Sequence, residues 1–216
     1  MASLNSNRQM NKAGRSLIFI TSLFLLVVLI SIPFLFKIDP PIPFEKQPIN
    51  DRIAPFFSNS VQFWNEDIQA WAAEYDLDPN LIATVMQIES CGNPSVISSA
   101  GAMGLFQVMP FHFLYGEDPF DPTTNALRGL TYLSDSMYLA GQNPNLGLAG
   151  YNGGVGVIQW SSDQWYDETQ RYVYWGSRIL EDANANLTQS SAYDEWYGSY
   201  GYWMCEDARS QLGLIP

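Results

Sequence analysis

Apolar residues along most of this chain recur every three or four positions, which is the spacing of an amphipathic helix. Between residues 61 and 75 the repeat is carried by Trp64, Ile68 and Trp71. Further helices are expected at residues 125–140, 145–151 and 167–180. No sustained two-residue alternation, the mark of a half-buried strand, accompanies them. The chain is therefore expected to be mainly α.

One predicted helix has well-marked ends. Asp78 is a typical N-cap and Pro79 suits the first helical position. Gly92 and Pro94 should stop the helix soon after Glu89.

Glu89 continues the apolar face of that helix, which is formed by Ile82, Val85 and Met86. A carboxyl group there is poorly solvated and faces the negative end of the helix dipole, and both effects raise its pKa. Such a group keeps its proton near neutral pH and can act as a general acid. A solvated glutamate at a helix end is the alternative interpretation.

Residues 16–36 carry no charge and are rich in Leu, Ile, Val and Phe, a length that can cross a bilayer. Basic residues precede them, so residues 1–15 are expected in the cytoplasm and the rest of the chain outside it. A cleaved signal peptide with secretion is the alternative. The proline-rich residues 37–52 are expected to form a linker, and residues 53–216 one domain.

The charge is strongly unbalanced beyond this apolar segment. Only six of the ten basic residues follow position 37, against all 22 acidic ones. An acidic surface of this kind repels nucleic acid, so no nucleic-acid partner is expected. Nothing in the sequence indicates an obligate oligomer, and a monomer is expected.

Cys91 and Cys205 are the only cysteines, and both fall on the expected outer side, where disulfides persist. A disulfide between them would tie the end of the chain to the turn after Glu89. Two unpaired thiols are the alternative. Without a Cys/His cluster, neither a metal site nor another cofactor is expected.

Residues 98–110 contain two glycines at 101 and 104, and Gln107 supplies an amide suited to sugar hydroxyl and acetamido groups. The order Glu89-Ser90, Asn93-Pro94, Ser98-x-x-Gly-Ala-x-Gly-Leu-x-Gln-x-Met-Pro110 resembles the catalytic core of the soluble lytic transglycosylases, the goose-lysozyme-like peptidoglycan enzymes. Tyr-Asn-Gly-Gly at 151–154 and Glu-Thr-Gln-Arg-Tyr-Val at 168–173 resemble two further motifs of that family.

The resemblance implies a lysozyme-like domain of short helices around a glycan cleft, with Glu89 as the sole catalytic acid. It places Ser98, Gln107, Met109 and Tyr151 along the sugar cleft, and Asn152 and Tyr172 at positions that shape the site. Tyr151 is the residue expected to hydrogen-bond the Glu89 carboxyl. For Asn152, fixing a loop is an equally good interpretation. The departures from the family pattern are Phe106, Gly150 and Gly153, expected to be changes in flexible loops.

The family reaction needs one carboxylate instead of the usual pair. The acid protonates the oxygen between N-acetylmuramic acid and N-acetylglucosamine, and then takes the proton from the C6 hydroxyl of the muramic sugar, which closes a 1,6-anhydro ring. Hydrolysis of the same bond, as in goose-type lysozyme, and a non-catalytic peptidoglycan-binding module are the alternatives. Acids weighed as a second carboxylate are Asp118, Asp121, Asp163 and Asp167, of which Asp121 and Asp167 are interpreted as a turn or cap.

Two further features are interpreted as structural. His112, the only histidine, stands between two phenylalanines and is expected to be packed or on the surface. The tail from Tyr193 to Trp203 holds six aromatic residues, for which packing is favoured over an added glycan subsite.

Overall fold

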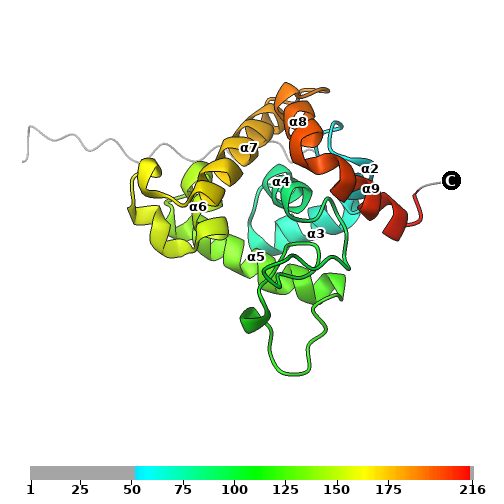
Figure 1. The fold of residues 1–216 in the computed structure, drawn as a ribbon, viewed down its shortest axis with the longest axis horizontal. Helices are drawn as coiled ribbons and strands as arrows, with labels where there is room; N and C mark the ends of the chain where they lie inside the picture. Colours follow the sequence, from blue (N-terminus) through cyan, green and yellow to red (C-terminus); the bar gives the residue numbers. More distant parts are fainter. Residues whose placement is uncertain (1–51, 215–216) are drawn as a thin grey trace, which may run out of the picture. The chain divides into compact units, whose positions relative to one another are not determined.

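The computed structural model describes residues 52–214 and forms nearly all of their regular structure from helices (Figure 1). In that range, β pairing is confined to isolated bridges. None of its helices is long and apolar enough to cross a membrane. The expected cytoplasmic segment, membrane anchor and all but the last residue of the linker lie outside the described residues.

The predicted helix of residues 61–75 is divided in two, α2 (Asn59–Gln62) and α3 (Asn65–Tyr75). Trp64 leaves the helical conformation between them, and its indole N–H donates to the carbonyl oxygen of Gly92 at 2.9 Å. The hydrogen bond to a distant segment accompanies a break in the helix that the repeat of apolar residues did not predict.

The helix that carries Glu89, α4 (Pro79–Glu89), has the predicted ends, and the Asp78 side chain accepts from the Asn80 backbone N–H. The next helix, α5 (Pro122–Leu139), begins at Pro122 because the Asp121 side chain caps the Thr124 N–H. After α6 (Pro144–Gly153), α7 (Asp167–Asn184) is longer than expected, and Asp167 is its first helical residue instead of its N-cap.

The C-terminal part forms elements that the sequence did not indicate. These are α8 (Ser191–Trp196), a π-helical turn η5 (Tyr197–Gly201) and α9 (Tyr202–Gln211). Three short 3₁₀ helices lie earlier in the chain, η2 (Pro110–His112), η3 (Val155–Gln159) and η4 (Ser162–Gln164).

One core joins the helices, and α4 lies near its centre (Figure 1). Five helices, α3 to α7, each place at least one fully buried aliphatic side chain in it, for example Ile68, Ile82, Leu130, Leu148 and Ile179. Burial of each such side chain contributes about 1.5–3 kcal/mol.

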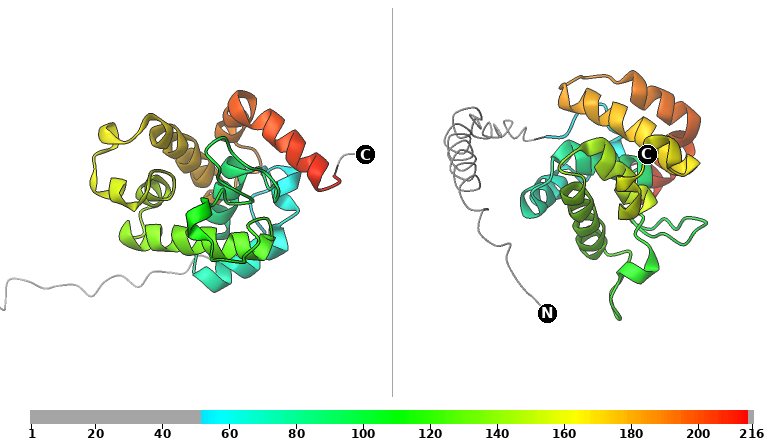
Figure 2. Two further views of the ribbon diagram at one scale, coloured as in Figure 1. Left: turned by 60° about the horizontal axis from the view of Figure 1, so that its bottom comes forward. Right: turned by 90° about the vertical axis from the view of Figure 1, so that its left-hand side faces the viewer.

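Helix α7 runs antiparallel to α4, and this pairing positions the candidate site. At one end the Asn80 amide donates to the Ala183 carbonyl oxygen, and towards the other end Gly176 lies against Ile88. The start of α7 therefore lies beside the end of α4. The long segment between α4 and α5 extends away from the helices in the right-hand view of Figure 2.

Candidate active site

Glu89 is the last residue of α4, and its side chain is partly exposed. Every residue from Asn80 to Gln87 in the same helix is buried. Burial of the carboxyl group raises the pKa of Glu89 to about 8, against an ordinary value of 4.5. The raised pKa expected from the sequence is confirmed, so Glu89 is mostly protonated at neutral pH.

Tyr172 on α7 is the residue whose hydroxyl acts on the pKa of Glu89. Its hydroxyl favours the ionised carboxylate and so lowers the pKa of Glu89, against the effect of burial. The hydroxyl is buried and completes no hydrogen bond of standard geometry. Burial and the nearby Glu89 charge hold the pKa of Tyr172 well above its ordinary value, so the hydroxyl keeps its proton and can donate.

Glu168 is the acidic side chain whose charge acts on Glu89, and it raises the pKa of Glu89 further. It is exposed and lies one helical turn before Tyr172 on α7. Glu168 was not among the acidic residues considered from the sequence as a second carboxylate. The i, i+4 spacing of Glu168 and Tyr172 was the available signal, because such residues share a helix face.

Tyr151 does not donate to Glu89, which corrects the expectation from sequence. Its hydroxyl donates to the Phe106 carbonyl oxygen at 2.6 Å. The Tyr151 ring is still near the acid, because the Glu89 charge contributes to a pKa of Tyr151 well above its ordinary value, after the larger effect of burial. Tyr151 thus joins α6 to the glycine-rich loop beside Glu89.

The glycine-rich loop is held by backbone pairing and by the helix that carries Glu89. Antiparallel bridges join Met103 to Ile97 and to Val108. Ser90, buried directly after Glu89, donates through its hydroxyl to the Leu105 carbonyl oxygen at 2.7 Å. A displacement of the loop would therefore act on Ser90, which is the residue next to Glu89.

The other predicted cleft residues lie in this loop and are partly exposed. The Ser98 hydroxyl accepts from the Ala102 N–H at 3.0 Å. The Gln107 amide nitrogen donates to the Gly104 carbonyl oxygen at 3.0 Å and to that of Val96 at 3.3 Å. Met109 immediately precedes η2 and is half-buried. The side chains of Ser98 and Gln107 therefore stabilise the conformation of the loop by hydrogen bonds to its backbone.

Asn125 organises the far side of the loop and was missed by the sequence reasoning. It is buried; its amide nitrogen donates to the carbonyl oxygens of Met103 and Pro119, and its amide oxygen accepts from the Phe106 N–H. Gly104 has a φ of +73°, and a Cβ there would lie 2.4 Å from the Asn125 side-chain nitrogen. Glycine is required at this position both for its conformation and for this close approach.

The departures from the family pattern fall in packed positions, not in flexible loops. Phe106 is fully buried, and its ring lies 5.8 Å from that of Trp71. Gly150 and Gly153 belong to α6, where a Cβ would meet the hydroxyl oxygen of Ser136 at 2.4 Å or that of Thr169 at 2.7 Å, respectively. The neighbouring side chains leave no room for alanine.

The Asn152 side chain makes a structural contact, as in the second interpretation from the sequence. Its amide oxygen accepts from the Thr169 hydroxyl at 2.8 Å, which joins the end of α6 to the first turn of α7. This bond holds the two helices that carry Tyr151 and Tyr172.

The remaining candidates are accounted for by structural contacts. Asp118 and Asp121 cap the backbone N–H groups of Phe120 and Thr124, and Asp163 lies exposed in η4. His112 is half-buried, with its ring 4.6 Å from that of Phe111 and 5.0 Å from that of Tyr132.

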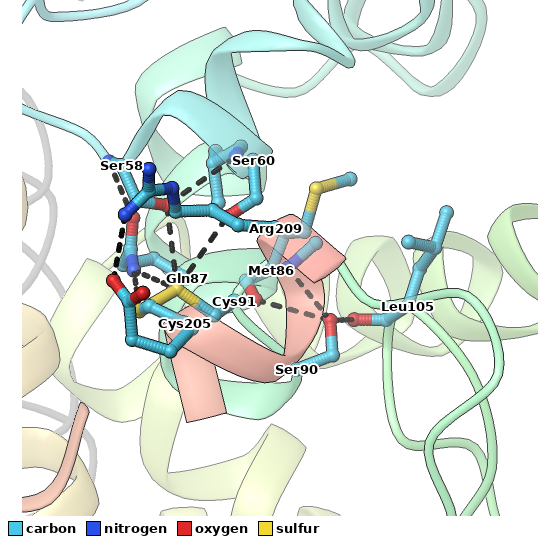
Figure 3. The surroundings of a disulfide bond; sticks show 12 residues. Ser58, Ser60, Met86, Gln87, Ser90, Cys91, Leu105, Cys205 and Arg209 are labelled. Atoms are coloured by element: carbon cyan, nitrogen blue, oxygen red, sulfur yellow. Dashed lines mark hydrogen bonds and ion pairs between the residues drawn. A yellow bond between two sulfur atoms is a disulfide. The ribbon is translucent and has the colours of Figure 1, made fainter. Parts of the chain in front are cut away.

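Cys91 and Cys205 form the expected disulfide, which fastens α9 to the turn after α4 (Figure 3). Gln87 lies between this bond and the chain near α2. Its buried amide nitrogen donates to the sulfur of Cys91 at 2.8 Å and to that of Cys205 at 3.3 Å, while its oxygen accepts from the Ser58 N–H at 3.0 Å. The covalent link thus lies two residues from Glu89.

A hollow lined by Arg52, Ile53, Asn80 and Ala183 lies at the other end of α4. Asn80 and Glu89 are nine positions apart in the helix, which is about 13 Å along its axis. That hollow is not part of the candidate site.

Comparison with known proteins gives the family. A family model described as the transglycosylase SLT domain matches residues 66–173, half of the chain. The chain belongs to the SLT family. All seven residues of the candidate site (Glu89, Ser98, Gln107, Met109, Tyr151, Asn152 and Tyr172) fall within the match, whereas Cys205 and the three C-terminal elements follow it.

Characterised relatives agree with this assignment. A transglycosylase of Enterobacteria phage PRD1 is 40% identical over 107 residues, which are 49% of this chain and 40% of the relative. The membrane-bound lytic murein transglycosylase E of Buchnera aphidicola is 33% identical over 35% of this chain and 40% of its own length. The chain thus spans about two fifths of these relatives.

A solved complex of the 70-kDa soluble lytic transglycosylase with bulgecin A matches 58% of this chain and 26% of that protein. The TM-score is 0.50 and the sequence identity 21%. At this identity the similarity establishes the fold, which is that of a mainly helical, lysozyme-like SLT domain.

Proposed function

We propose that this chain is a peptidoglycan lytic transglycosylase that cleaves the β-1,4 bond between N-acetylmuramic acid and N-acetylglucosamine. The observation that carries the proposal is a carboxyl group with a pKa of about 8, at the end of a buried helix, in an SLT domain. A protonated acid at neutral pH is what the glycosidic oxygen needs in order to leave.

In the proposed mechanism Glu89 acts twice. It first gives its proton to the glycosidic oxygen, and the substrate's acetamido group stabilises the cation that forms at C1 of the muramic sugar. The ionised Glu89 then takes the proton of the C6 hydroxyl, whose oxygen bonds to C1 and closes the 1,6-anhydro ring. No water is consumed, and Glu89 is protonated again at the end.

Tyr172 has a defined part in this cycle. Its hydroxyl favours the ionised form of Glu89, which exists only between the two proton transfers. Donation from Tyr172 to the carboxylate therefore lowers the energy of the intermediate more than that of the starting state. Burial, with a smaller contribution from the charge of Glu168, keeps the resting acid protonated.

The sugar is proposed to lie along the glycine-rich loop, in contact with Ser98, Gln107, Met109 and Tyr151. The hydrogen bonds that the first two make within the loop fix their side chains before substrate arrives. Such preorganisation lowers the cost of binding. Asn152 is proposed to act by holding α6 against α7.

The variant Glu89→Gln tests the enzyme proposal. It keeps the size of the side chain but has no proton to donate, so release of muropeptides from purified peptidoglycan should fall about 10²–10⁴-fold. Glu181→Gln, the same change at an exposed position of α7, is the matched control. Unchanged release by Glu89→Gln would overturn the proposal that Glu89 is the catalytic acid, and no release by either protein would leave a non-catalytic binding module.

Hydrolysis of the same bond is the second candidate, and Glu168 is the observation in its favour. An exposed carboxylate whose charge acts on the general acid could activate water. Mass spectrometry of the products separates the two reactions, because transglycosylation leaves anhydro-muramic ends and hydrolysis leaves reducing ends. Reducing ends that disappear in Glu168→Gln would establish the hydrolase.

We further propose that residues 16–36 anchor the enzyme in the membrane, with residues 37–52 as a linker and the catalytic domain, as a monomer, on the extracytoplasmic side. Support comes from the uncharged 21-residue segment and from relatives named as membrane-bound. Full-length chain should sediment with membranes and need detergent for release. Recovery of a chain shortened at its N-terminus in the soluble fraction would favour a cleaved signal peptide.

A further inference from the structure

The π-helical turn η5 presents an exposed aromatic side chain next to the helix that carries Tyr172. Tyr200, the fourth of the five residues of this turn, is 60% exposed. Its ring centroid lies 6.4 Å from that of Trp175 on α7, with the two planes at 65°. Two aromatic side chains from separate elements thus form one surface, here called the Trp175–Tyr200 pair.

One member of this pair lies on the same helix as Tyr172 of the candidate active site. Trp175 follows Tyr172 by three residues on α7, and side chains at that spacing are neighbours about 5–6 Å apart on a helix face. Tyr172 itself acts on Glu89. Trp175 is half-buried against the core, whereas Tyr200 reaches solvent. The aromatic surface therefore begins one helical turn from the reacting groups and extends outward.

Several contacts fix the pair in place. The Arg178 guanidinium lies over the Tyr174 ring at 4.8 Å and the Trp175 ring at 5.6 Å, and Glu195 on α8 holds it by an ion pair. A Cβ at Gly201 would lie 2.6 Å from the Trp196 ring, so glycine lets η5 pack closely on α8. A π-helical turn is rare and is found frequently at functional sites.

The disulfide holds the segment that carries Tyr200 beside the catalytic helix. Cys205 is five residues after Tyr200 and is bonded to Cys91, two residues after Glu89. Both members of the pair also lie beyond residue 173, where the match to the SLT family ends. The pair therefore lies outside the matched segment, although Trp175 is on a helix that begins inside it.

The chemistry of the pair fits a pyranose ring. One side of a sugar carries C–H groups, which are attracted to the electron-rich face of an aromatic ring, while the hydroxyl groups remain in water. Anionic partners such as nucleic acid or acidic lipid are disfavoured, since only six basic residues accompany 22 acids after position 37.

We infer that the Trp175–Tyr200 pair is an additional subsite that binds a sugar of the glycan strand outside the sugars flanking the cleaved bond. The inference rests on the proposed peptidoglycan substrate, and it adds that the length of the glycan strand affects binding. Long strands reach the subsite and short fragments do not, so the enzyme prefers long strands.

Tyr200→Ala removes the exposed ring without disturbing the core, and it should raise KM for long glycan strands about three- to tenfold, the effect of losing one aromatic contact. The preference for long over short strands should fall by the same factor. Tyr200→Phe, which keeps the ring, should retain the preference. Tyr138→Ala, which removes a tyrosine side chain that is 78% exposed on α5, is the matched control.

Binding measured in the Glu89→Gln background separates this inference from the proposed function. Long, peptide-free glycan strands should bind Glu89→Gln more tightly than Glu89→Gln/Tyr200→Ala, and should quench tryptophan fluorescence on binding. Equal affinities in a wild type that cleaves peptidoglycan would overturn the subsite and leave the function standing. Weaker binding only of peptide-bearing strands would assign the surface to the stem peptide and overturn the sugar assignment.

Discussion

At the residue scale, Glu89 shows how a single pKa is set by opposing neighbours. Burial raises the pKa most, Tyr172 lowers it by hydrogen bonding to the ionised form, and the charge of Glu168 raises it. Because catalysis begins with the protonated acid, kcat/KM should fall as the pH rises through the pKa of about 8. This fall of kcat/KM at high pH is the alkaline limb of the pH profile. Removal of Tyr172 and removal of Glu168 should shift it in opposite directions.

Tyr172→Phe removes the hydroxyl that favours ionisation, so the pKa of Glu89 rises and the alkaline limb moves to higher pH. Glu168→Gln removes a like charge, so the pKa falls and the limb moves to lower pH. The measurement is the pH dependence of kcat/KM for muropeptide release, with Glu181→Gln as control. Shifts in the same direction for both variants would contradict this assignment of the neighbours.

At the element scale, the active site depends on how the long segment between α4 and α5 is held. Ser90 bonds it to α4, Tyr151 to α6 and Asn125 to α5. The segment has little regular structure of its own, so these side-chain bonds take the place of a sheet or helix. Asn125 makes three such bonds from one buried side chain.

Asn125→Ala should lower the free energy of unfolding by about 2–4 kcal/mol, because it removes these bonds and leaves buried backbone groups without partners. Urea denaturation followed by circular dichroism measures the change. Asn145→Ala, an exposed asparagine near the start of α6, should have a small effect. A loss equal to that of the control would show that the segment is held by other contacts.

Local signals in the sequence predicted the helices well. Asp78 acts on a residue two positions away, so the local sequence places the start of α4, whereas α5 begins at Pro122, three residues before the expected start. The roles of Tyr151, Asn125 and Glu168 could not be predicted in this way. Apart from the Pro119 carbonyl oxygen that Asn125 contacts, their partners lie 19 or more residues away or on another helix.

The tail was hardest to predict for a different reason. Its aromatic residues serve two purposes, since Trp196 is buried at 2% exposure whereas Trp203 is 80% exposed. The packing interpretation from sequence holds for Trp196 and for the half-buried Tyr193 and Tyr197. A count of aromatic residues cannot separate the two groups, because a helical turn of the π type shifts which side chains face outward.

At the scale of the whole molecule, the Cys91–Cys205 bond joins positions 114 residues apart. Its removal by reductant, or by the double change Cys91→Ser/Cys205→Ser, should lower the free energy of unfolding by about 2–5 kcal/mol. Thermal unfolding with and without reductant measures this. The double variant should not respond to reductant, and an equal response in both proteins would show that the bond is not the cause.

The position of the same bond in the chain also sets an order of assembly. Cys205 lies 114 residues after Cys91, so the bond cannot close until the helices between the two cysteines have been synthesised and, in the proposed exported enzyme, carried to an oxidising compartment. The helix that bears Glu89 therefore receives its covalent support late. An enzyme exported as proposed would reach its final stability only after it had left the compartment where it was made.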